Sequence, residues 1–375
     1  MSKGLIFVGQ ELCLGDGVTR KVYAQKRAFD KLCDSCPILH PVNRKRGVDY
    51  YIGDSFFVKI IFVKGLSRVM LLFFYAKLFK YIKVNKLSFI YIRYFKCASR
   101  PFINLLRKIH NIGCKVVLEI PTFPYDGETS ELGFRDKISI FREKYFRAKF
   151  STCVDFVVTT STGYDRIFNC ETLCISNAVD PQEIPVHGFH SDSKCIHMIA
   201  VANIAFWHGL DRIIIGFAEY YAKEHSIEVY LDIVGDGDTS VISELQKLIV
   251  QNHLDVYVKL LGRKNGEELD KLFDSSDLAI GCLGCHRKSV GELKSLKNVE
   301  YAMRGLPFIY SEINSDFDDK PYVLKVPQDD SSINISDVVN FYRSVNLSPS
   351  DIRRTVSDLS WDRQISSIVE HLKQL

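Results

Sequence analysis

Short apolar runs alternate with longer amphipathic segments along most of the chain, and this alternation restricts the fold more than any other feature. Apolar runs of this length are typical of buried strands, and the segments between them have the length of helices. Strands that alternate with helices build a parallel sheet with crossover connections. The sequence therefore predicts an α/β protein. The runs lie at 4–9, 87–94, 115–120 and 153–161 in the first half, and at 195–203, 227–235, 256–263, 278–284 and 307–312 in the second.

The alternation stops once, near the middle of the chain. Between positions 180 and 194, prolines, histidines and small polar residues replace the apolar runs, as is typical of a linker. A chain of 375 residues is also longer than one hydrophobic core usually supports. We therefore predict two doubly wound domains that face a cleft, 1–185 and 186–355. A terminal helical segment, 356–375, is expected to pack back toward the first domain.

The apolar runs are too short to place the chain in a membrane. The start, MSKGLIFVGQ, leads directly into a strand and lacks the long apolar core of a signal peptide. The longest candidate, 69–76, is flanked by Arg68 and Lys77, and a bilayer span needs ~20 apolar residues. We therefore expect a cytoplasmic protein.

Eleven scattered cysteines, an odd number, do not indicate disulfides in such a protein. Two pairs have the C-x-x-C spacing of many zinc sites, Cys33 with Cys36 and Cys282 with Cys285. A four-cysteine site would need these pairs to converge from opposite halves of the chain, without the compact sequences that usually surround such sites. We interpret Cys282 and Cys285 as small packing residues and predict no metal site.

The net charge of +4 conceals a local bias. The segment 55–118 contains thirteen Lys or Arg and no Asp or Glu, among many Phe, Tyr, Leu and Ile. One interpretation is an amphipathic helix and a buried strand with solvated lysines. We favour a cationic, aromatic face that binds an anionic membrane surface or a phosphorylated acceptor. Nucleic acid is not expected, because no recognised nucleic-acid motif accompanies the charge.

The segment 291–309, GELKSLKNVEYAMRGLPFI, combines two glutamates, three cations and a helix stop. Ser295 is suited to begin a helix and Gly305 to end it, and Pro307 prevents its continuation. The segment therefore predicts a helix over Leu296–Arg304. Free backbone N–H groups and the positive end of the helix dipole make such an N-terminus suitable for a diphosphate.

Charged side chains surround this predicted N-terminus. Lys294 and Lys297 flank it, and Glu300 lies on the same helix face as Lys297. Glu292 precedes the helix. Glu300 can accept hydrogen bonds from sugar or ribose hydroxyls beside the phosphates, and Glu292 can do so beyond them. The arrangement thus reaches two different parts of one ligand.

These residues resemble a known family. Glu292 and Glu300, separated by seven residues and followed by YAMRGLPFI, resemble the Glu-x7-Glu motif of retaining GT-B-fold glycosyltransferases of the family 4 type. Other segments resemble further motifs of that family in the same order, and the WHG, DR and SLK variant is similar to bacterial transferases that build capsular or O-antigen polysaccharide. The resemblance covers about 156–309 well and the first half only in outline. The further segments are ISNAVD at 175–180, VANIAFWHGLDR at 201–212, IVGDGD at 233–238 and the stretch 260–281.

The resemblance implies two Rossmann-like domains in a GT-B arrangement and specific roles for several residues. Glu300 would bind the ribose of a nucleotide-sugar, and Glu292 would contact the transferred sugar. The catalytic set would be Glu292, Lys294 and Lys297. Further donor-side candidates are Ser295, Leu296, Gly235, Arg263 and Lys264, of which the last two would border the base.

One departure from the family pattern concerns the leaving diphosphate. The family usually places Arg and Lys in the phosphate loop, whereas this chain has Asn203 and His208 near those positions. Because charge develops on the diphosphate and no metal is expected, other cations must stabilise it. The candidates are Lys294, Lys297, Arg212 and Arg287. The segment Asp236–Asp238 imitates a metal-binding Asp-x-Asp, but we interpret it as a turn in which Gly237 has an unusual backbone angle.

The first half offers weaker candidates for the acceptor side. A loop at 14–21 carries Gly15 and Gly17 and suits a ligand that contacts the backbone. The family commonly has a histidine after a central strand, and this chain has none there. The candidates are Glu119, near the end of the strand 115–120, and Thr122, Tyr125 and Asp126 after it. The segment PTFPYD reads equally well as a proline-fixed turn.

The sequence thus predicts an enzyme that transfers a sugar from a nucleotide-sugar, with UDP favoured, and retention follows from the family alone. The expected acceptor is a lipid-linked (polyprenyl diphosphate) or free saccharide for surface polysaccharide, at the inner face of the plasma membrane, with no cofactor. Two alternatives stay open. A nucleotide-sugar epimerase on the same fold would need acid/base residues that we do not find. A catalytically idle GT-B-like subunit fits the replaced Arg/Lys pair, but the retained Glu292 and Glu300 argue against it.

Overall fold

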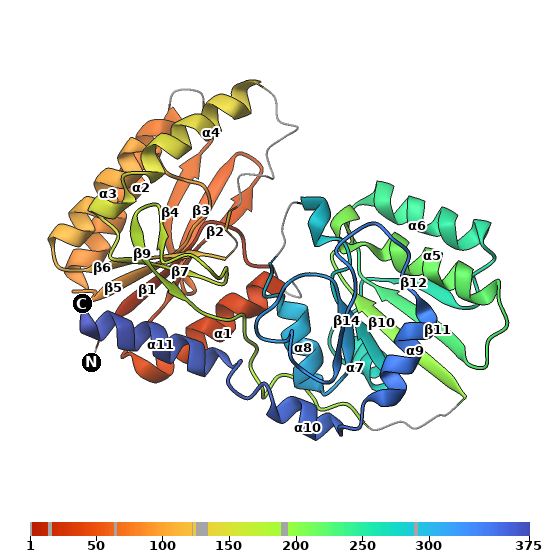
Figure 1. Ribbon diagram of the computed structural model, residues 1–375. Helices are drawn as coiled ribbons and strands as arrows, with labels where there is room; N and C mark the ends of the chain where they lie inside the picture. The colour runs from red at the N-terminus through yellow and green to blue at the C-terminus, as the bar shows by residue number, and fades with distance from the viewer. Residues whose placement is uncertain are drawn as a thin grey trace. The chain divides into compact units, whose positions relative to one another are not determined.

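The computed structural model divides into two α/β units (Figure 1). It describes residues 2–13, 17–63, 66–121, 123–124, 134–188, 194–288 and 292–375. Unit 1 consists of Met1–Ile175 and Trp361–Leu375, and unit 2 consists of Ser176–Ser360. The division lies at 175/176, whereas the composition change suggested 185/186. The reason is that Val179 and Ile184 are buried in the core of unit 2, and the Val179 N–H donates to the Leu359 carbonyl at 3.2 Å.

The sheet of unit 1 has the strand order β4-β3-β2-β1-β5-β6-β7-β9-β8. Its centre is parallel, as the apolar runs predict, because β1, β5, β6 and β7 are the four strands expected in the first half. The hairpins β2-β3-β4 at one edge were not predicted. The strands are β1 (Gly4–Val8), β2 (Ile38–Arg44), β3 (Gly47–Ile52), β4 (Ser55–Ile61), β5 (Phe89–Arg93), β6 (Lys115–Ile120), β7 (Phe156–Thr159), β8 (Arg166–Ile167) and β9 (Cys170–Cys174).

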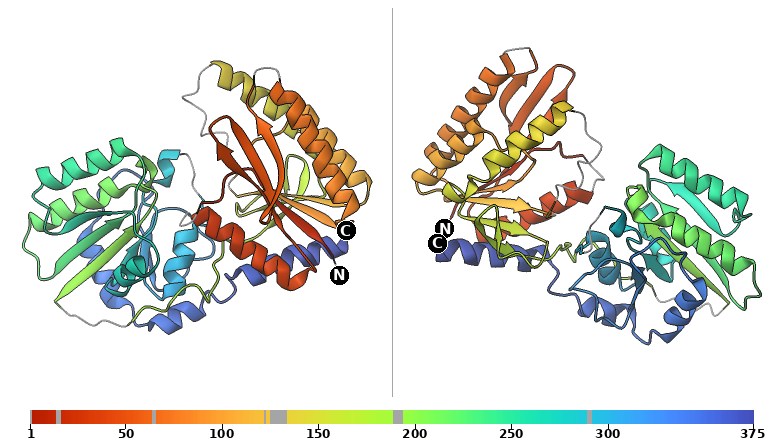
Figure 2. Two further views of the ribbon diagram at one scale, coloured as in Figure 1. Left: turned by 180° about the vertical axis from the view of Figure 1, so that it is seen from behind. Right: turned by 45° about the horizontal axis from the view of Figure 1, so that its top comes forward.

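Helices cover both faces of this sheet (Figure 1). One face packs against α2 (Leu66–Val84) and α3 (Arg100–Asn111). On the other face α1 (Gly17–Leu32) and α11 (Trp361–Gln374) lie side by side, as Figure 2 also shows. The terminal segment is therefore divided at 360/361, and its last helix belongs to unit 1. The remaining helices are α4 (Phe134–Arg147) and the short η2 (Phe150–Thr152).

Unit 2 contains a parallel sheet with the order β12-β11-β10-β13-β14-β15, which is the doubly wound order of dinucleotide-binding folds. All five strands predicted in the second half are present. They are β10 (Cys195–Val201), β11 (Glu228–Val234), β12 (Val258–Gly262), β13 (Leu278–Ile280) and β14 (Phe308–Tyr310), followed by β15 (Val323–Lys325). The helical segments are η3 (Phe206–His208), α5 (Leu210–Tyr221), α6 (Thr239–Gln251), α7 (Glu267–Asp274), η4 (Cys285–Lys288), α8 (Leu296–Arg304), α9 (Ile335–Ser344) and α10 (Pro349–Arg354).

The described part of the chain contains no helix of the length and apolar character that a bilayer span requires.

Candidate functional site

The order of strands in unit 2 defines where a ligand is expected. In an open parallel sheet, ligands bind at the carboxyl ends of the strands where the strand order reverses. In unit 2 this point lies between β10 and β13, and the loops after these strands touch. The Leu283 N–H donates to the His208 carbonyl at 3.0 Å, and a Cβ on Gly209 would lie 2.7 Å from the Leu283 carbonyl carbon. The close approach and a φ of +65° at position 209 both require glycine.

Helix α8 begins beside these loops with the bounds that the sequence predicts. It spans Leu296–Arg304, with Gly305 in the left-handed conformation after its last turn. Ser295 precedes the first turn but makes no side-chain capping hydrogen bond. Ser295 therefore leaves the first N–H groups of α8 uncapped, which suits an anionic ligand.

Lys297 lies in this first turn and is the best-placed cation of the site. Its side chain makes no hydrogen bond or salt bridge to any other described residue. Burial lowers the pKa of its ammonium group, and the neighbouring Cys282 and Glu312 oppose that shift. A partly desolvated cation without a fixed partner can interact strongly with a ligand phosphate.

Lys294, the other predicted cation of this helix end, is already paired. Its Nζ lies 2.9 Å from Asp316 Oδ1 and donates to Ser176 Oγ at 2.9 Å. The Asn177 side chain in turn donates to the Lys294 carbonyl at 2.6 Å. Lys294 therefore links the ISNAVD segment to the start of α8, and the structure gives it a positioning rather than a ligand-facing place.

The two predicted glutamates are carried by different elements, as their spacing suggested. Glu300 lies on α8, where its Oε1 accepts from Arg304 at 3.2 Å. Arg304 also pairs with Asp270 at 2.7 Å. Its single positive charge is therefore shared between two carboxylates, while it holds the Glu300 side chain in position. Glu292 lies before the helix, and its backbone pairs in parallel with Ile313 after β14.

His208 ends η3 and is neutral. Its Nδ1 accepts from the Ala205 N–H at 3.1 Å, which leaves the proton on Nε2. Burial, followed by the charge of Lys297, lowers the pKa of this imidazole to about 2. His208 can therefore donate a hydrogen bond from Nε2, but it cannot supply the positive charge of the family's usual residue.

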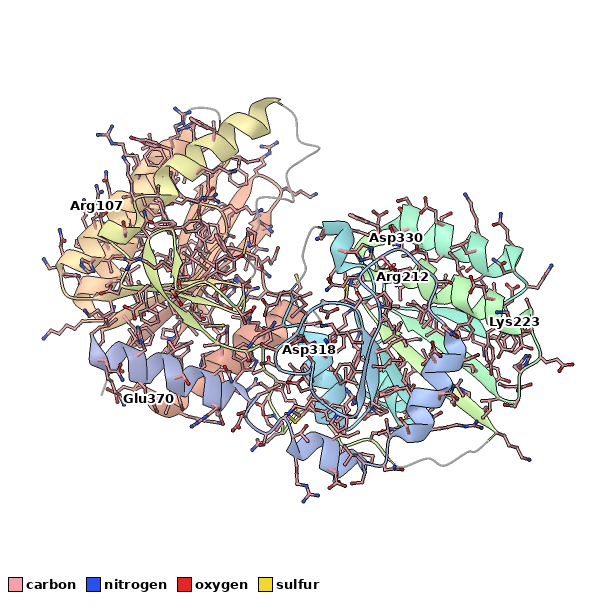
Figure 3. All side chains as sticks on the ribbon, viewed as in Figure 1. Arg107, Arg212, Lys223, Asp318, Asp330 and Glu370 are labelled. Atoms are coloured by element: carbon pink, nitrogen blue, oxygen red, sulfur yellow. The ribbon has the colours of Figure 1, made fainter. Side chains whose placement is uncertain are left out.

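Arg212 and Arg287 do not serve as free cations. Arg212 is 1% exposed, and its guanidinium donates to the carbonyl groups of Ser331 at 2.7 Å, Pro327 at 3.1 Å and Leu283. Its Nη2 also lies 3.5 Å from Oδ1 of Asp329, the residue before Asp330; Arg212 and Asp330 are labelled in Figure 3. Arg287 forms a two-pronged pair with Asp211 at 2.8 and 2.7 Å and also binds Asp330 at 2.7 Å. Both arginines fix the loops that border the site, which corrects their expected role.

The other donor-side candidates follow strands at the same edge. A Cβ on Gly235 would lie 1.7 Å from the Ala202 carbonyl oxygen, so this glycine allows the loops after β10 and β11 to touch. Asn203 and Arg263 are exposed, and Lys264 pairs with Glu268 at 3.7 Å. Gly237 has φ +154° as expected, and Asp238 caps α6 by accepting from the Ser240 N–H at 2.9 Å.

Three buried residues beside Lys297 were missed as site residues. Cys282 and Cys285 are each 3% exposed and their sulfurs lie 2.9 Å apart, while Glu312 is fully buried after β14. Burial, followed by the charge of Cys282, raises the pKa of Glu312 to about 8. A hydrogen bond from Cys285 lowers the pKa of Cys282 to about 6. The sequence feature that could have identified Glu312 is its place in PFIYSE, where an acidic residue follows the end of an apolar strand.

In unit 1 the structure places Glu119 in a buried charge cluster rather than at an open edge. It is 1% exposed, and its Oε1 lies 2.9 Å from Lys21 Nζ and 3.1 Å from Arg93 Nη1. Despite its burial, these two cations lower the pKa of Glu119 to about 2. The pKa of Lys21 is also lowered, because the effect of burial on its ammonium group is larger than the opposing effect of Glu119. Gly17 begins α1, whereas Gly15, Thr122, Tyr125 and Asp126 lie outside the described residues.

The buried cluster predicts an acid-sensitive unit 1. A carboxyl group whose pKa falls from 4.5 to about 2 on folding stabilises the fold above pH 4.5 and loses this contribution as the pH falls toward 2. We expect up to ~3 kcal/mol of unfolding free energy to be lost in that window. The measurement is urea unfolding between pH 6 and 3, followed by Trp361 fluorescence in a Trp207→Phe variant, because each unit has one tryptophan.

Glu119→Gln should be less stable at neutral pH, because Lys21 and Arg93 lose their partner, and should lack most of the acid dependence. Glu171→Gln, an exposed position on β9, is the control. Parallel acid profiles for the parent and Glu119→Gln would show that another group dominates.

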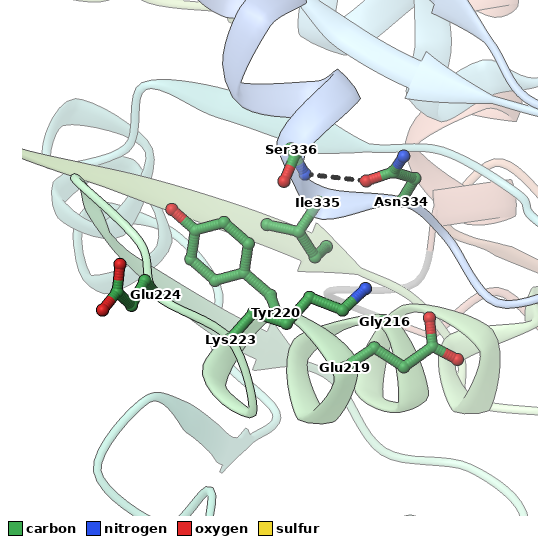
Figure 4. Close-up of a pocket in the computed structure, with 8 residues that line it drawn as sticks. All are labelled: Gly216, Glu219, Tyr220, Lys223, Glu224, Asn334, Ile335 and Ser336. Carbon is green, nitrogen blue, oxygen red and sulfur yellow. Dashed lines mark hydrogen bonds between the residues drawn. The ribbon is translucent and has the colours of Figure 1, made fainter.

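A separate pocket lies away from this edge, between α5 and the start of α9 (Figure 4). Glu219, Tyr220, Lys223 and Glu224 line one side of it, and Asn334 caps α9 by accepting from the Ser336 N–H at 3.1 Å. The site residues predicted from the sequence do not reach it.

No protein-family model matches the sequence, and the search of curated proteins gave no match. Solved structures, in contrast, resemble the chain over its full length at low sequence identity. A glycosyltransferase from Rickettsia africae is 12% identical with a TM-score of 0.67, and the match covers 100% of this chain and 98% of that one. HepE of Anabaena in complex with UDP is 13% identical with a TM-score of 0.65, and both chains are covered completely. Sucrose-phosphate synthase from Thermosynechococcus elongatus is 13% identical with a TM-score of 0.66, and 99% of each chain is covered. The chain therefore has the GT-B fold of these glycosyltransferases, with two Rossmann-like units.

Proposed function

We propose that the protein is a glycosyltransferase that moves a sugar from a nucleotide-sugar, with UDP as the favoured nucleotide. The observation that carries this proposal is the start of α8 at the switch point of the sheet. There, Ser295 does not cap the first N–H groups, and the Lys297 ammonium makes no hydrogen bond or salt bridge within the described part of the chain. Glu300 lies further along α8, and Glu292 lies before the helix, where its backbone pairs with Ile313. HepE, which shares the fold, was crystallised with UDP and with UDP-glucose, and this supports the same class of donor here.

The chemistry that the site supports is electrostatic. As the bond between sugar and diphosphate breaks, negative charge grows on the diphosphate, and preorganised donors stabilise it most. The first turn of α8 and Lys297 supply such donors, and neutral His208 adds an Nε2–H group. Glu300 accepts from the ribose and Glu292 from the transferred sugar. This transfer needs no metal ion, and retention would follow from attack on the face that the diphosphate leaves.

The acceptor proposal rests on unit 1. The strand β4, the residues directly after it and one side of α2 expose a group of large apolar side chains, and α2 packs beside β4. Exposed cations, among them Arg68, Lys80 and Lys83, share this helix without any acid. Such a surface suits an anionic membrane and a polyprenyl-diphosphate-linked saccharide, as in family 4 enzymes of capsular or O-antigen synthesis. The apolar side chains are Phe56, Phe62, Val63, Leu66, Val69, Leu72 and Phe73.

Nucleotide binding tests the donor site first. UDP, GDP, CDP and ADP are added at millimolar concentration, and the melting temperature is followed for the parent chain and for Glu300→Ala. A ligand at one hundred times its Kd stabilises the folded state by ~2.7 kcal/mol. We expect UDP to raise the melting temperature and Glu300→Ala to lose most of that increase. Glu244→Ala, an exposed position on α6, should keep it.

If no nucleotide stabilises the parent chain, the donor site is not functional, and an idle GT-B-like subunit becomes the better explanation. A shift by a different nucleotide would keep the transferase and replace UDP.

Vesicle binding tests the acceptor face independently. We expect the protein to co-sediment with vesicles that contain phosphatidylglycerol and to bind neutral vesicles weakly, because both apolar and cationic groups contribute. Leu72→Ser with Phe73→Ser should reduce binding at least fivefold. Val250→Ser with Val256→Ser, an exposed apolar pair in unit 2, should not. Equal binding to neutral and anionic vesicles would contradict the electrostatic part.

A further inference from the structure

The cluster of Cys282, Cys285 and Glu312 has the donor set of a metal site. One ligand atom of each residue lies within 4.8 Å of the others, and all three residues are buried. Cys282 and Cys285 follow β13 and enter η4, and Glu312 follows β14, so the sheet brings together residues from two strand ends. Within the described residues this is the one group of His, Cys, Asp and Glu with such geometry.

An unpaired buried oxygen points to a missing ligand. Glu312 is fully buried, and its Oε2 has no hydrogen-bond partner, which costs free energy unless a cation or donor meets it. Its Oε1 is oriented by the Asn298 side chain, which donates at 3.2 Å. Metal-binding carboxylates are typically oriented by such a neighbouring hydrogen bond.

We propose that Cys282, Cys285 and Glu312 bind one structural Zn²⁺ ion that joins the ends of β13 and β14 behind the first turn of α8. Two thiolates and a carboxylate suit zinc, which prefers tetrahedral sites with sulfur, nitrogen and oxygen ligands. The Trp207 carbonyl oxygen, which accepts from the Cys282 sulfur at 2.9 Å, or a water molecule would complete the tetrahedron. Binding would move the two sulfurs apart by ~1 Å, because each Zn–S bond is ~2.3 Å long.

The charges balance when the ion is present. Three anionic ligands and one Zn²⁺ leave a single negative charge, and the ammonium group of Lys297 is the nearby cation that offsets it. The ion would thus support the element that carries Lys297. This inference does not depend on the proposed transfer reaction, because a structural ion would bind in the same way if the protein transferred no sugar.

Cobalt is a suitable probe, since it occupies zinc sites and its thiolate complexes absorb light. The 375-residue chain is first reduced. Reductant and metal are then removed under anaerobic conditions, and the protein is titrated with Co²⁺. We expect about one Co²⁺ per chain, a thiolate-to-cobalt charge-transfer band that Zn²⁺ removes, and a higher melting temperature with Zn²⁺. Cys282→Ala and Cys285→Ala should abolish the band, and Glu312→Gln should weaken binding at least tenfold.

Two control variants separate this cluster from other thiols. Cys33→Ala with Cys36→Ala removes the buried C-x-x-C pair of unit 1. Cys195→Ala removes a half-buried thiol 3.6 Å from His197 Nε2. Both should retain the band. If the parent chain has free Cys282 and Cys285 thiols by alkylation and still shows no band, the proposal is wrong. A band that survives in Cys282→Ala, or that the Cys195→Ala change removes, would equally overturn it.

Discussion

Replacement of Lys297 by methionine is expected to reduce the rate of sugar transfer by ~10²–10³-fold, the usual cost of losing one preorganised donor to a developing negative charge. The same change should leave the melting temperature of the metal-free protein equal or higher. Burial lowers the pKa of this ammonium group, which means that the folded protein bears a desolvation cost that an apolar side chain of similar length would avoid. A loss of activity without a loss of stability is the pattern expected of a functional cation.

The measurement is release of the nucleotide identified by the binding experiment, at saturating donor and under matched protein concentrations. Lys247→Met, at an exposed position on α6, is the control for removal of one positive charge. The decrease should appear mainly in kcat, since the interaction strengthens as the diphosphate leaves. Transfer within threefold of the parent rate would exclude Lys297 as the stabilising cation.

Replacement of Arg212 by methionine is expected to lower the free energy of unfolding of unit 2 by about 3–5 kcal/mol, because several buried acceptors lose their donor together. The guanidinium binds the carbonyl groups of Leu283, Pro327 and Ser331, so it joins the loop after β13 to the segment after β15. Its loss should therefore also weaken nucleotide binding, through the position of the Leu283 loop.

Urea unfolding followed by Trp207 fluorescence in a Trp361→Phe background reports unit 2 alone, since Trp361 belongs to unit 1. Arg343→Met, an exposed arginine on α9, is the matched control and should change the unfolding free energy by less than ~0.5 kcal/mol. A loss below ~1 kcal/mol for Arg212→Met would mean that water replaces the guanidinium at these carbonyl groups.

The GT-B fold is weaker evidence for a particular function than the chemistry of the site is. A fold supports many functions, and only the residues at the site argue for one of them. Here those residues are the uncapped start of α8, Lys297 and the two glutamates, all in unit 2. The structure presents them at the strand ends where ligands of this sheet type bind.

Patterns of neighbouring residues were enough to predict the parallel strands and helix α8. The apolar runs became β1, β5, β6 and β7 in unit 1 and β10–β14 in unit 2, because buried parallel strands read as continuous apolar segments. Helix α8 has its predicted bounds, since Ser295, Gly305 and Pro307 act locally on the backbone. The hairpins β2-β3-β4 were missed because polar residues interrupt their alternation, although Gly53 and Asp54 form a two-residue connection typical of a hairpin.

Only the tertiary structure decided which charged side chains are already paired within the protein. The sequence does not distinguish Lys297 from four other charged residues that it offers as ligand contacts: Lys294, Arg212, Arg287 and Glu119. Their partners, however, come from distant segments. They are Asp316 for Lys294, Ser331 and Pro327 for Arg212, Asp211 for Arg287, and Lys21 for Glu119. The meeting of Cys282, Cys285 and Glu312 likewise depends on β13 and β14 being neighbours in the sheet. Backbone preference acts over a few residues, whereas ion pairing and burial depend on which strands the fold places side by side.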